Sequence, residues 1–222
     1  MAEVTFRELT AGLRRLGLSK DSHVVAHVSL SSFGRVRGGA TAVAAALTHV
    51  CGTVIMPAFT YQTMVVPPIG PPDNGITYGE RDEQNQMSEF WHADLPVHRT
   101  IGAVAEALRG HPEAWRSDQP VLSFVGVGRL ARDVINAQLL TDPLAPLDVL
   151  MSRGGDLLLL GVGLTRATVV HLAERRAGRR TFMRWALTTQ PALARPQTGE
   201  RQARTRPLSA GGGAREPIHE AL

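Results

Sequence analysis

The sequence predicts an α/β fold in which helices flank a central sheet of parallel or mixed strands. Short apolar segments typical of strands alternate along the chain with segments of helical periodicity. Residues 22–59 follow the order strand, loop, helix, strand, which is typical of a parallel βαβ unit. At 222 residues, 43% of them hydrophobic, the chain has the size of one domain with a sizeable core.

The predicted elements follow from local periodicity and from residues that start and stop helices. Residues 5–16 are predicted as a helix, because Phe6, Leu9 and Leu13 recur at helical spacing behind the capping residue Thr5. Predicted strands cover 22–28, 52–59, 121–127, 156–161 and 181–187, and predicted helices cover 40–50, 100–109, 129–138 and 168–177. Residues 60–98 form a long polar connection, and loops of this length are usually functional or disordered.

Residues 188–222 differ from the rest of the chain. They show no apolar periodicity and are rich in Arg, Pro, Gly and Gln. Such a composition is typical of a flexible tail. The sequence therefore predicts a single domain over residues 1–187 and a divergent tail over residues 188–222.

Composition argues against several classes of protein. No run approaches the ~18 apolar residues of a membrane span, and the N-terminal residues lack the apolar stretch of a secretion signal, so we expect a cytoplasmic protein without a membrane partner. The single cysteine, Cys51, excludes an intrachain disulfide and argues against a cysteine-based metal site, so no metal is expected. The formal charge is +4, but no basic stretch is interleaved with aromatic residues, which argues against nucleic-acid binding.

The segment Thr168–Glu174 places a histidine and a carboxylate on the first turns of a predicted helix. His171 and Glu174 are three residues apart and therefore share one face of that helix. A neutral histidine at this place can act as a general base, because the positive end of the helix dipole disfavours the imidazolium form. The alternative is a histidine that caps or packs the start of the helix.

The loop Ser29–Gly39 combines hydroxyls, glycines and arginines between a predicted strand and a predicted helix. Glycines let the backbone approach a ligand closely, and a helix N-terminus presents free amides to an anion. The loop is therefore either a phosphate-binding segment or a glycine-rich turn without a ligand. It matches neither the P-loop nor the dinucleotide-binding pattern.

Two further segments can be interpreted either as ligand-binding segments or as ordinary solvated structure. Arg116 and Ser123 lie before and within a predicted strand, where they either hold a phosphate or belong to a solvated turn. Residues 73–94 hold six acids against one arginine. This acidic loop either attracts a cationic ligand or is simply solvated.

Together, these segments resemble the antibiotic acetyltransferases typified by aminoglycoside 3-N-acetyltransferases. The matching stretches follow one another in the order and at the spacing of that family and cover residues 1–187. They are His27-Val-Ser29-Leu-Ser-Ser-Phe-Gly34-Arg-Val-Arg-Gly-Gly39, Gly52–Pro57, Gly102–Arg109, Arg116–Phe124, Leu158–Gly163 and His171-Leu-Ala-Glu174.

The resemblance implies an antibiotic N-acetyltransferase-like fold and the transfer of an acetyl group from acetyl-CoA to the 3-amino group of a 2-deoxystreptamine aminoglycoside, which confers resistance. His171 would be the general base, with Glu174 as its candidate partner. Acetyl-CoA and the antibiotic would be the partners of a monomer or homodimer. The implied coenzyme contacts are Ser29, Leu30, Ser31, Ser32, Phe33, Gly34, Val36, Arg37, Arg116 and Ser123, and the candidate contacts to the antibiotic's ammonium groups are Asp73, Glu80, Asp82 and Glu83.

Two departures from the family pattern keep alternatives open. The family usually has His-Pro where this chain has Gln119-Pro120. Residues 188–222 do not match the stretch that supplies an acidic partner of the catalytic histidine in relatives. The alternatives are a catalytically impaired homologue that still binds coenzyme A, and an enzyme that acetylates a different amine.

Overall fold

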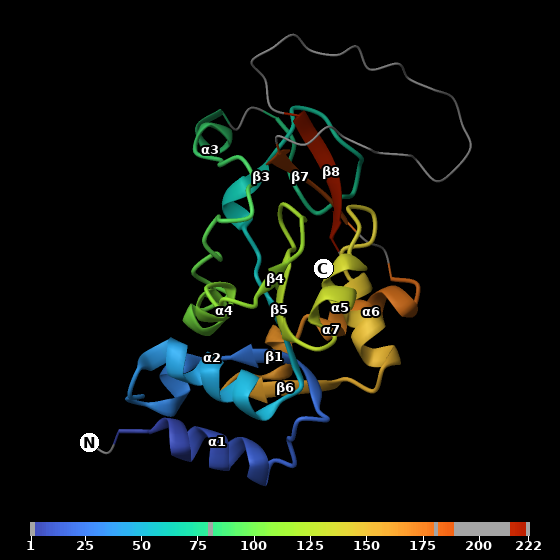
Figure 1. Ribbon diagram of the computed structural model, residues 1–222. Helices are drawn as coiled ribbons and strands as arrows, with labels where there is room; N and C mark the ends of the chain where they lie inside the picture. Colours follow the sequence, from blue (N-terminus) through green and yellow to red (C-terminus); the bar gives the residue numbers. More distant parts are fainter. Residues whose placement is uncertain (1–2, 80–81, 180–181, 189–213, 221–222) are drawn as a thin grey trace.

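The computed structural model describes residues 3–79, 82–179, 182–188 and 214–220, and it confirms the predicted α/β class (Figure 1). A five-stranded sheet has the order β4-β5-β2-β1-β6, and a three-stranded sheet has the order β3-β7-β8. The strands of the first sheet are β1 (His23–Val28), β2 (Thr53–Pro57), β4 (Trp115–Arg116), β5 (Phe124–Gly128) and β6 (Asp156–Leu160). Those of the second are β3 (Met64–Val65), β7 (Phe182–Thr188) and β8 (Ala214–Glu220).

The five-stranded sheet is mixed. Strand β1 pairs in parallel with both β2 and β6. Helix α2 (Gly39–Val50) connects β1 to β2, which confirms the predicted parallel βαβ unit. Strand β5 runs antiparallel to β2, and β4 runs antiparallel to β5. The carboxyl ends of β1, β2 and β6 therefore meet at one edge of the sheet.

Helices pack on both faces of this sheet. One core joins the sheet to α1 (Phe6–Arg15), α2 and α4 (Ala103–Arg109), and the other joins it to α5 (Ala131–Asn136), α6 (Ala145–Ser152) and α7 (Val169–Arg176). Strand β1 shows how the faces divide, because Val24 and Ala26 belong to the first core and Val25 to the second. Side chains two residues apart on a strand share a face. His27 therefore lies on the face that packs against α5, α6 and α7.

Helix α1 begins where the sequence predicts. The Glu8 amide donates to the Thr5 hydroxyl at 3.3 Å, and the Thr5 amide donates to the Glu8 carboxylate at 2.8 Å. These reciprocal bonds satisfy amides that have no partner inside the helix.

The long connection 60–98 carries regular structure within its described residues. Strand β3 pairs antiparallel with β7, and the short helix α3 (Asp82–Gln86) follows. An isolated bridge joins Trp91 to Thr188. The connection is thus anchored on β7 at two places, which local sequence patterns did not reveal.

The C-terminal region also differs from its prediction. Residues 189–213 lie outside the described residues, so the predicted tail is not tested there. Ala214–Glu220, for which no regular structure was expected, form strand β8 and pair antiparallel with β7 along its whole length. None of the described helices is long and apolar enough to cross a membrane.

Candidate active site

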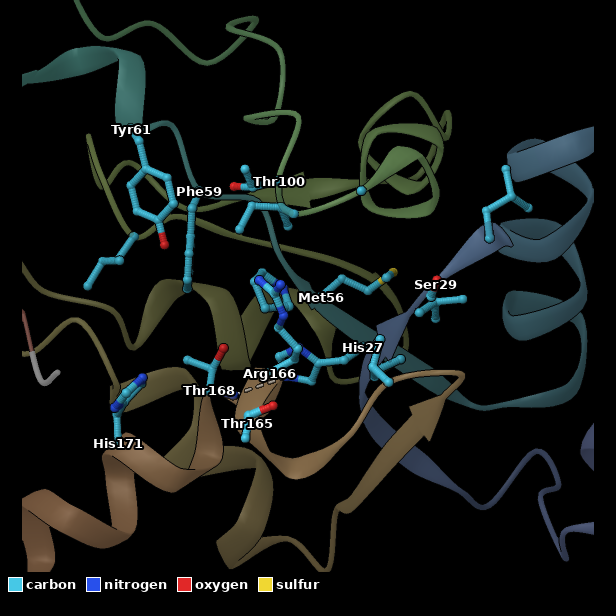
Figure 2. Close-up of a pocket in the computed structure, with 18 of the residues that line it drawn as sticks. His27, Ser29, Met56, Phe59, Tyr61, Thr100, Thr165, Arg166, Thr168 and His171 are labelled. Carbon is cyan, nitrogen blue, oxygen red and sulfur yellow. Dashed lines mark hydrogen bonds between the residues drawn. The ribbon is translucent and has the colours of Figure 1, made fainter. Parts of the chain in front are cut away.

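A cavity of about 680 Å³ opens at the carboxyl ends of the parallel strands β1, β2 and β6 (Figure 2). Ligands of open α/β sheets bind at this edge. Its wall is built from the three segments that follow these strands, from the loop before α4, and from the start of α7. The residues that line the cavity include His27, Val28, Ser29, Leu30, Ser31, Met56, Leu122, Arg166, Thr168 and His171.

His171 and Glu174 form the pair that the sequence predicts. His171 lies in the first turn of α7 and lines the cavity, and its Nδ1 is 3.1 Å from the Glu174 carboxylate. This hydrogen bond lowers the pKa of the Glu174 carboxyl below its ordinary value; burial opposes the shift and Arg179 reinforces it. An ionised Glu174 keeps the proton of the neutral imidazole on Nδ1, and Nε2 of His171 then carries the lone pair that a general base needs.

His27 is linked to the same helix start. The backbone amide of Thr168, the residue that precedes α7, donates to His27 Nε2 at 3.3 Å. Burial lowers the pKa of His27 to about 4, so the ring is neutral near pH 7. Figure 2 shows Thr168 between the two histidines.

The lowered pKa of His27 predicts a pH dependence of stability. The unfolded chain binds a proton at His27 below about pH 6.5, whereas the folded chain does so only below about 4. Stability is therefore lost as the pH falls through this window, by about 3 kcal/mol in total. Urea unfolding of the wild type and of His27→Gln should show their difference in unfolding free energy shrink by that amount between pH 7 and pH 4. A constant difference would contradict the assignment.

The Ser29–Phe33 turn presents two hydroxyls to the cavity. Ser29 and Ser31 both line it, and their hydroxyl oxygens are 3.1 Å apart. The Ser32 hydroxyl donates to the Ser29 carbonyl at 2.7 Å and thereby closes the turn. Gly161, which directly follows β6, lies against this turn with a positive φ of 67°.

Gly161→Ala tests how tightly this turn is packed. A Cβ at Gly161 would lie 1.7 Å from the Ser32 hydroxyl oxygen, so Ser32 must move and its bond to Ser29 must break. We expect a loss of about 2–3 kcal/mol in unfolding free energy. Gly17→Ala is the matched control, because it has the same backbone strain (φ 87°) with no atom within 4 Å. Equal losses in the two variants by urea unfolding would show that the contact with Ser32 has no effect.

The predicted coenzyme contacts divide into two groups. Ser29, Leu30 and Ser31 line the cavity. The other predicted contacts on this loop do not line the cavity. Ser32 closes the turn, Phe33 lines a separate apolar groove beside α1 and α2, and Gly34 is exposed. Val36 forms a β-bridge with Val4, and the Arg37 guanidinium pairs with the Glu3 carboxylate at 3.0 Å. Only the first part of the predicted loop therefore faces the cavity in this structure.

Arg116 and Ser123, which were predicted as coenzyme contacts, are not among the described residues that line the cavity. The Arg116 guanidinium donates to the carbonyls of Ala58, Ala93 and Leu95, and to the Ser123 hydroxyl at 3.2 Å. Burial lowers the pKa of Arg116 to about 10, so it remains charged near pH 7. Ser123 is fully buried and donates to the Ala58 carbonyl at 2.6 Å. Arg116 thereby joins Ala58, which follows β2, to the loop before α4, and Ser123 bonds both Arg116 and Ala58.

Gln119, where the family usually has histidine, is buried beside this network. Its Oε1 accepts from the amides of Val121 and Leu122 at 2.9 and 2.6 Å. The two amides are therefore held in a turn, and Leu122 lines the cavity. Strand β5 begins after this turn, at Phe124 rather than at the predicted residue 121.

None of the predicted substrate contacts is among the described residues that line the cavity. Asp73 and Glu83 do not line the cavity. Glu80 and the side chain of Asp82 lie outside what the structure describes. Among the described lining residues there is no aspartate or glutamate.

The cavity is also lined by His27, Arg166 and Thr168, which received no role from the sequence. His27 was noted only as part of a matching stretch; the spacing of two residues from Val25 could have shown that both side chains share one face of the strand. Thr168 and Arg166 have no local signal. Arg166 is the only lysine or arginine among the described lining residues and forms no ion pair within the described part of the chain. No cluster of metal-ligating side chains is found among the described residues.

The fold and the cavity define an α/β protein with a histidine–glutamate pair beside a serine-bearing turn. The family model described as aminoglycoside 3-N-acetyltransferase matches residues 25–215. The chain therefore belongs to this family, as the sequence motifs predicted.

Individual relatives agree with this assignment. The aminoglycoside N(3')-acetyltransferase-like protein YokD from an SPbeta prophage of Bacillus subtilis is 34% identical over 78% of this chain and 65% of its own length. Aminoglycoside N(3)-acetyltransferase III of Serratia marcescens is 31% identical over 77% of this chain and 64% of its own. The chain thus spans just under two thirds of these relatives. A solved structure of AAC-IIIb in binary complex with CoASH shares the fold, with a TM-score of 0.74, 24% identity and coverage of 100% of this chain and 77% of that chain.

Proposed function

We propose that the chain transfers an acetyl group from acetyl-CoA to an amine, namely the 3-amino group of a 2-deoxystreptamine aminoglycoside, and thereby confers antibiotic resistance. The observation that carries the proposal is the His171–Glu174 pair at the wall of a cavity whose other wall is the Ser29–Ser31 turn. Family membership supports the same reaction. We place the reaction in the cytoplasm, as expected for a chain whose single cysteine is a buried free thiol, and the protein is proposed to act as a monomer or homodimer.

The residues present fit an acetylated pantetheine arm. Val28, Leu30 and Met56 supply apolar walls, and Ser29 and Ser31 supply hydroxyl donors. Arg166 adds a positive charge that suits a phosphate group. The AAC-IIIb structure of similar fold contains CoASH, which supports this assignment.

His171 is proposed as the general base of the reaction. An ammonium group is not nucleophilic, so the amine first loses a proton to solvent and reacts in its neutral form. As the neutral amine attacks, Nε2 of His171 accepts an N–H proton from it, and the ionised Glu174 carboxylate stabilises the resulting imidazolium. As the carbon–sulfur bond breaks, the same proton passes from His171 to the departing thiolate.

The test measures coenzyme binding and turnover separately. Isothermal titration with acetyl-CoA checks the binding site, and release of the coenzyme thiol in the presence of gentamicin- and neomycin-class antibiotics checks the reaction. The proposal expects binding, antibiotic-dependent thiol release, and protection of a susceptible bacterium. Binding without thiol release for any antibiotic would overturn the aminoglycoside assignment.

The cavity also favours a second candidate. An aminoglycoside carries several ammonium groups, and a site for it needs carboxylates, yet the described lining contains none. The second candidate is therefore a coenzyme A-binding homologue that is catalytically impaired or acetylates an amine with fewer charges. Thiol release with simple monoamines, but not with aminoglycosides, would select the latter form.

A further inference from the structure

We propose that His27 is a second catalytic residue of this cavity, whose Nδ1–H donates a hydrogen bond to the carbonyl oxygen of the acetyl group and stabilises the negative charge that develops there. This inference rests on the proposed acetyl transfer and assigns a second role beside that of His171. It follows from the hydrogen bonding, the surroundings and the position of the His27 ring.

The hydrogen bonding of His27 fixes its tautomer. Its Nε2 accepts the Thr168 amide at 3.3 Å and must therefore carry a lone pair. The proton of the neutral ring is consequently on Nδ1. Among the residues that the structure describes, no group hydrogen-bonds this Nδ1, and it is not among the buried polar atoms without a partner. Since His27 lines the cavity, the donor is available to a ligand there.

The surroundings of His27 keep the ring neutral. Burial disfavours the charged form of the ring. The amide that it accepts comes from the start of α7, where the helix dipole is positive and also disfavours the imidazolium form. A neutral imidazole held in this way is a suitable donor to a carbonyl oxygen and is not itself deprotonated in the reaction.

The position of His27 relative to His171 is also fixed. The Thr168 amide binds His27, and the Thr168 carbonyl accepts the His171 amide at 3.0 Å. Both rings line the same cavity, with Thr168 between them (Figure 2). A base and an oxyanion donor must both lie beside the reacting carbon. Thr168 joins these two groups in one rigid unit.

The proposed step balances as follows. The amine nitrogen forms a bond to the carbonyl carbon, and the π electron pair moves onto the oxygen, where the Nδ1–H of His27 binds it. His171 Nε2 takes the proton of the amine. The carbonyl then re-forms, the carbon–sulfur bond breaks, and the thiolate receives the proton from His171. His27 keeps its own proton throughout.

Two substitutions separate the functions of the two ring nitrogens. His27→Gln places an amide oxygen near Nε2, so it preserves an acceptor for Thr168 but removes the Nδ1 donor. His27→Asn places an amide nitrogen near Nδ1, so it preserves a donor but removes the acceptor. His49→Gln is the matched control, because His49 lies on α2, contacts Arg14 and does not line the cavity.

The decisive readout is a comparison of two ligands in the absence of an amine. Acetyl-CoA and S-ethyl-coenzyme A differ chiefly in the carbonyl oxygen. By isothermal titration we expect the wild type and His49→Gln to prefer acetyl-CoA by about fivefold. His27→Gln should lose this preference, and His27→Asn should retain part of it. The kcat of His27→Gln should fall about 10²-fold, with the larger loss in kcat than in KM for acetyl-CoA.

The outcomes distinguish this inference from the proposed function. If His27→Gln keeps the preference for acetyl-CoA, or if the wild type binds the two ligands equally, the role of His27 is overturned while coenzyme binding stands. If the wild type binds neither ligand, both proposals are overturned. Thermal unfolding of the three variants identifies any loss that comes from misfolding, and a folded His27→Asn with normal binding and turnover supports the donor role.

Discussion

Replacing His171 with alanine is expected to lower kcat for acetyl transfer by about 10²–10⁴-fold. Among the described residues that line the cavity, His171 is the only base oriented by an ionised carboxylate. Its Nδ1 is 3.1 Å from the carboxylate of Glu174. Binding of acetyl-CoA should change little, because the proton acceptor acts in the chemical step. Thiol release under saturating coenzyme and amine measures the effect.

Two further variants test this prediction, one as a control and one at the partner of His171. His49→Ala removes an imidazole from α2, outside the cavity, and should leave kcat unchanged. Glu174→Gln keeps the shape of the partner but removes its charge, so it should give a smaller loss in kcat than His171→Ala and a change in the pH profile. Equal rates for the wild type and His171→Ala would remove His171 from the mechanism.

Replacing Arg116 with methionine is expected to lower the free energy of unfolding by about 3 kcal/mol. The guanidinium is half-buried, is bonded to three backbone carbonyls and to Ser123, and lies over the ring of Trp91 at 4.6 Å. Methionine fills a similar volume but leaves the carbonyls of Ala93 and Leu95 and the Ser123 hydroxyl without the Arg116 donor, whereas the Ala58 carbonyl keeps its bond from Ser123. Urea unfolding at pH 7 measures the difference.

The matched control for Arg116 is another arginine that stacks on tryptophan. Arg132 lies over Trp115 at 4.7 Å but is exposed. Arg132→Met should therefore change stability by no more than about 0.5 kcal/mol. If Arg116→Met also lowers the free energy of unfolding by less than about 1 kcal/mol, the hydrogen bonds of Arg116 contribute little to the stability of the fold.

Local patterns were enough to predict many of the secondary-structure elements. Helix α1 follows from its apolar spacing and its capping residue, and the βαβ unit of β1, α2 and β2 follows from the change from strand to helical periodicity. Helix α6 was missed, since Pro146 stands within it and no cap precedes it. The pairing of β3 and β8 with β7 could not be predicted, because strands so far apart in sequence leave no mutual local signal.

In the candidate site, too, some features could be predicted from local sequence and others could not. The His171–Glu174 pair was predictable, because residues at i and i+3 of a helix are neighbours wherever the helix lies. Asp73 and Glu83 were grouped by composition alone, and the fold does not bring them to the cavity. Arg116 and Ser123 were predicted at a ligand; they are not among the described residues that line the cavity, and both donate hydrogen bonds to the Ala58 carbonyl.

The sequence by itself determined the α/β class, the family and the histidine–glutamate pair, because each depends on spacing within a short segment or on an ordered set of such segments. Only the tertiary structure decided which residues share the cavity and what each can do. The hydrogen bond from the Thr168 amide to His27 Nε2 joins residues 141 positions apart in the chain. This contact fixes the tautomer of His27 and so puts the N–H donor on Nδ1. A side chain's protonation and its free hydrogen-bonding groups depend on neighbours in space, which the packing of the sheet and α7 brings together.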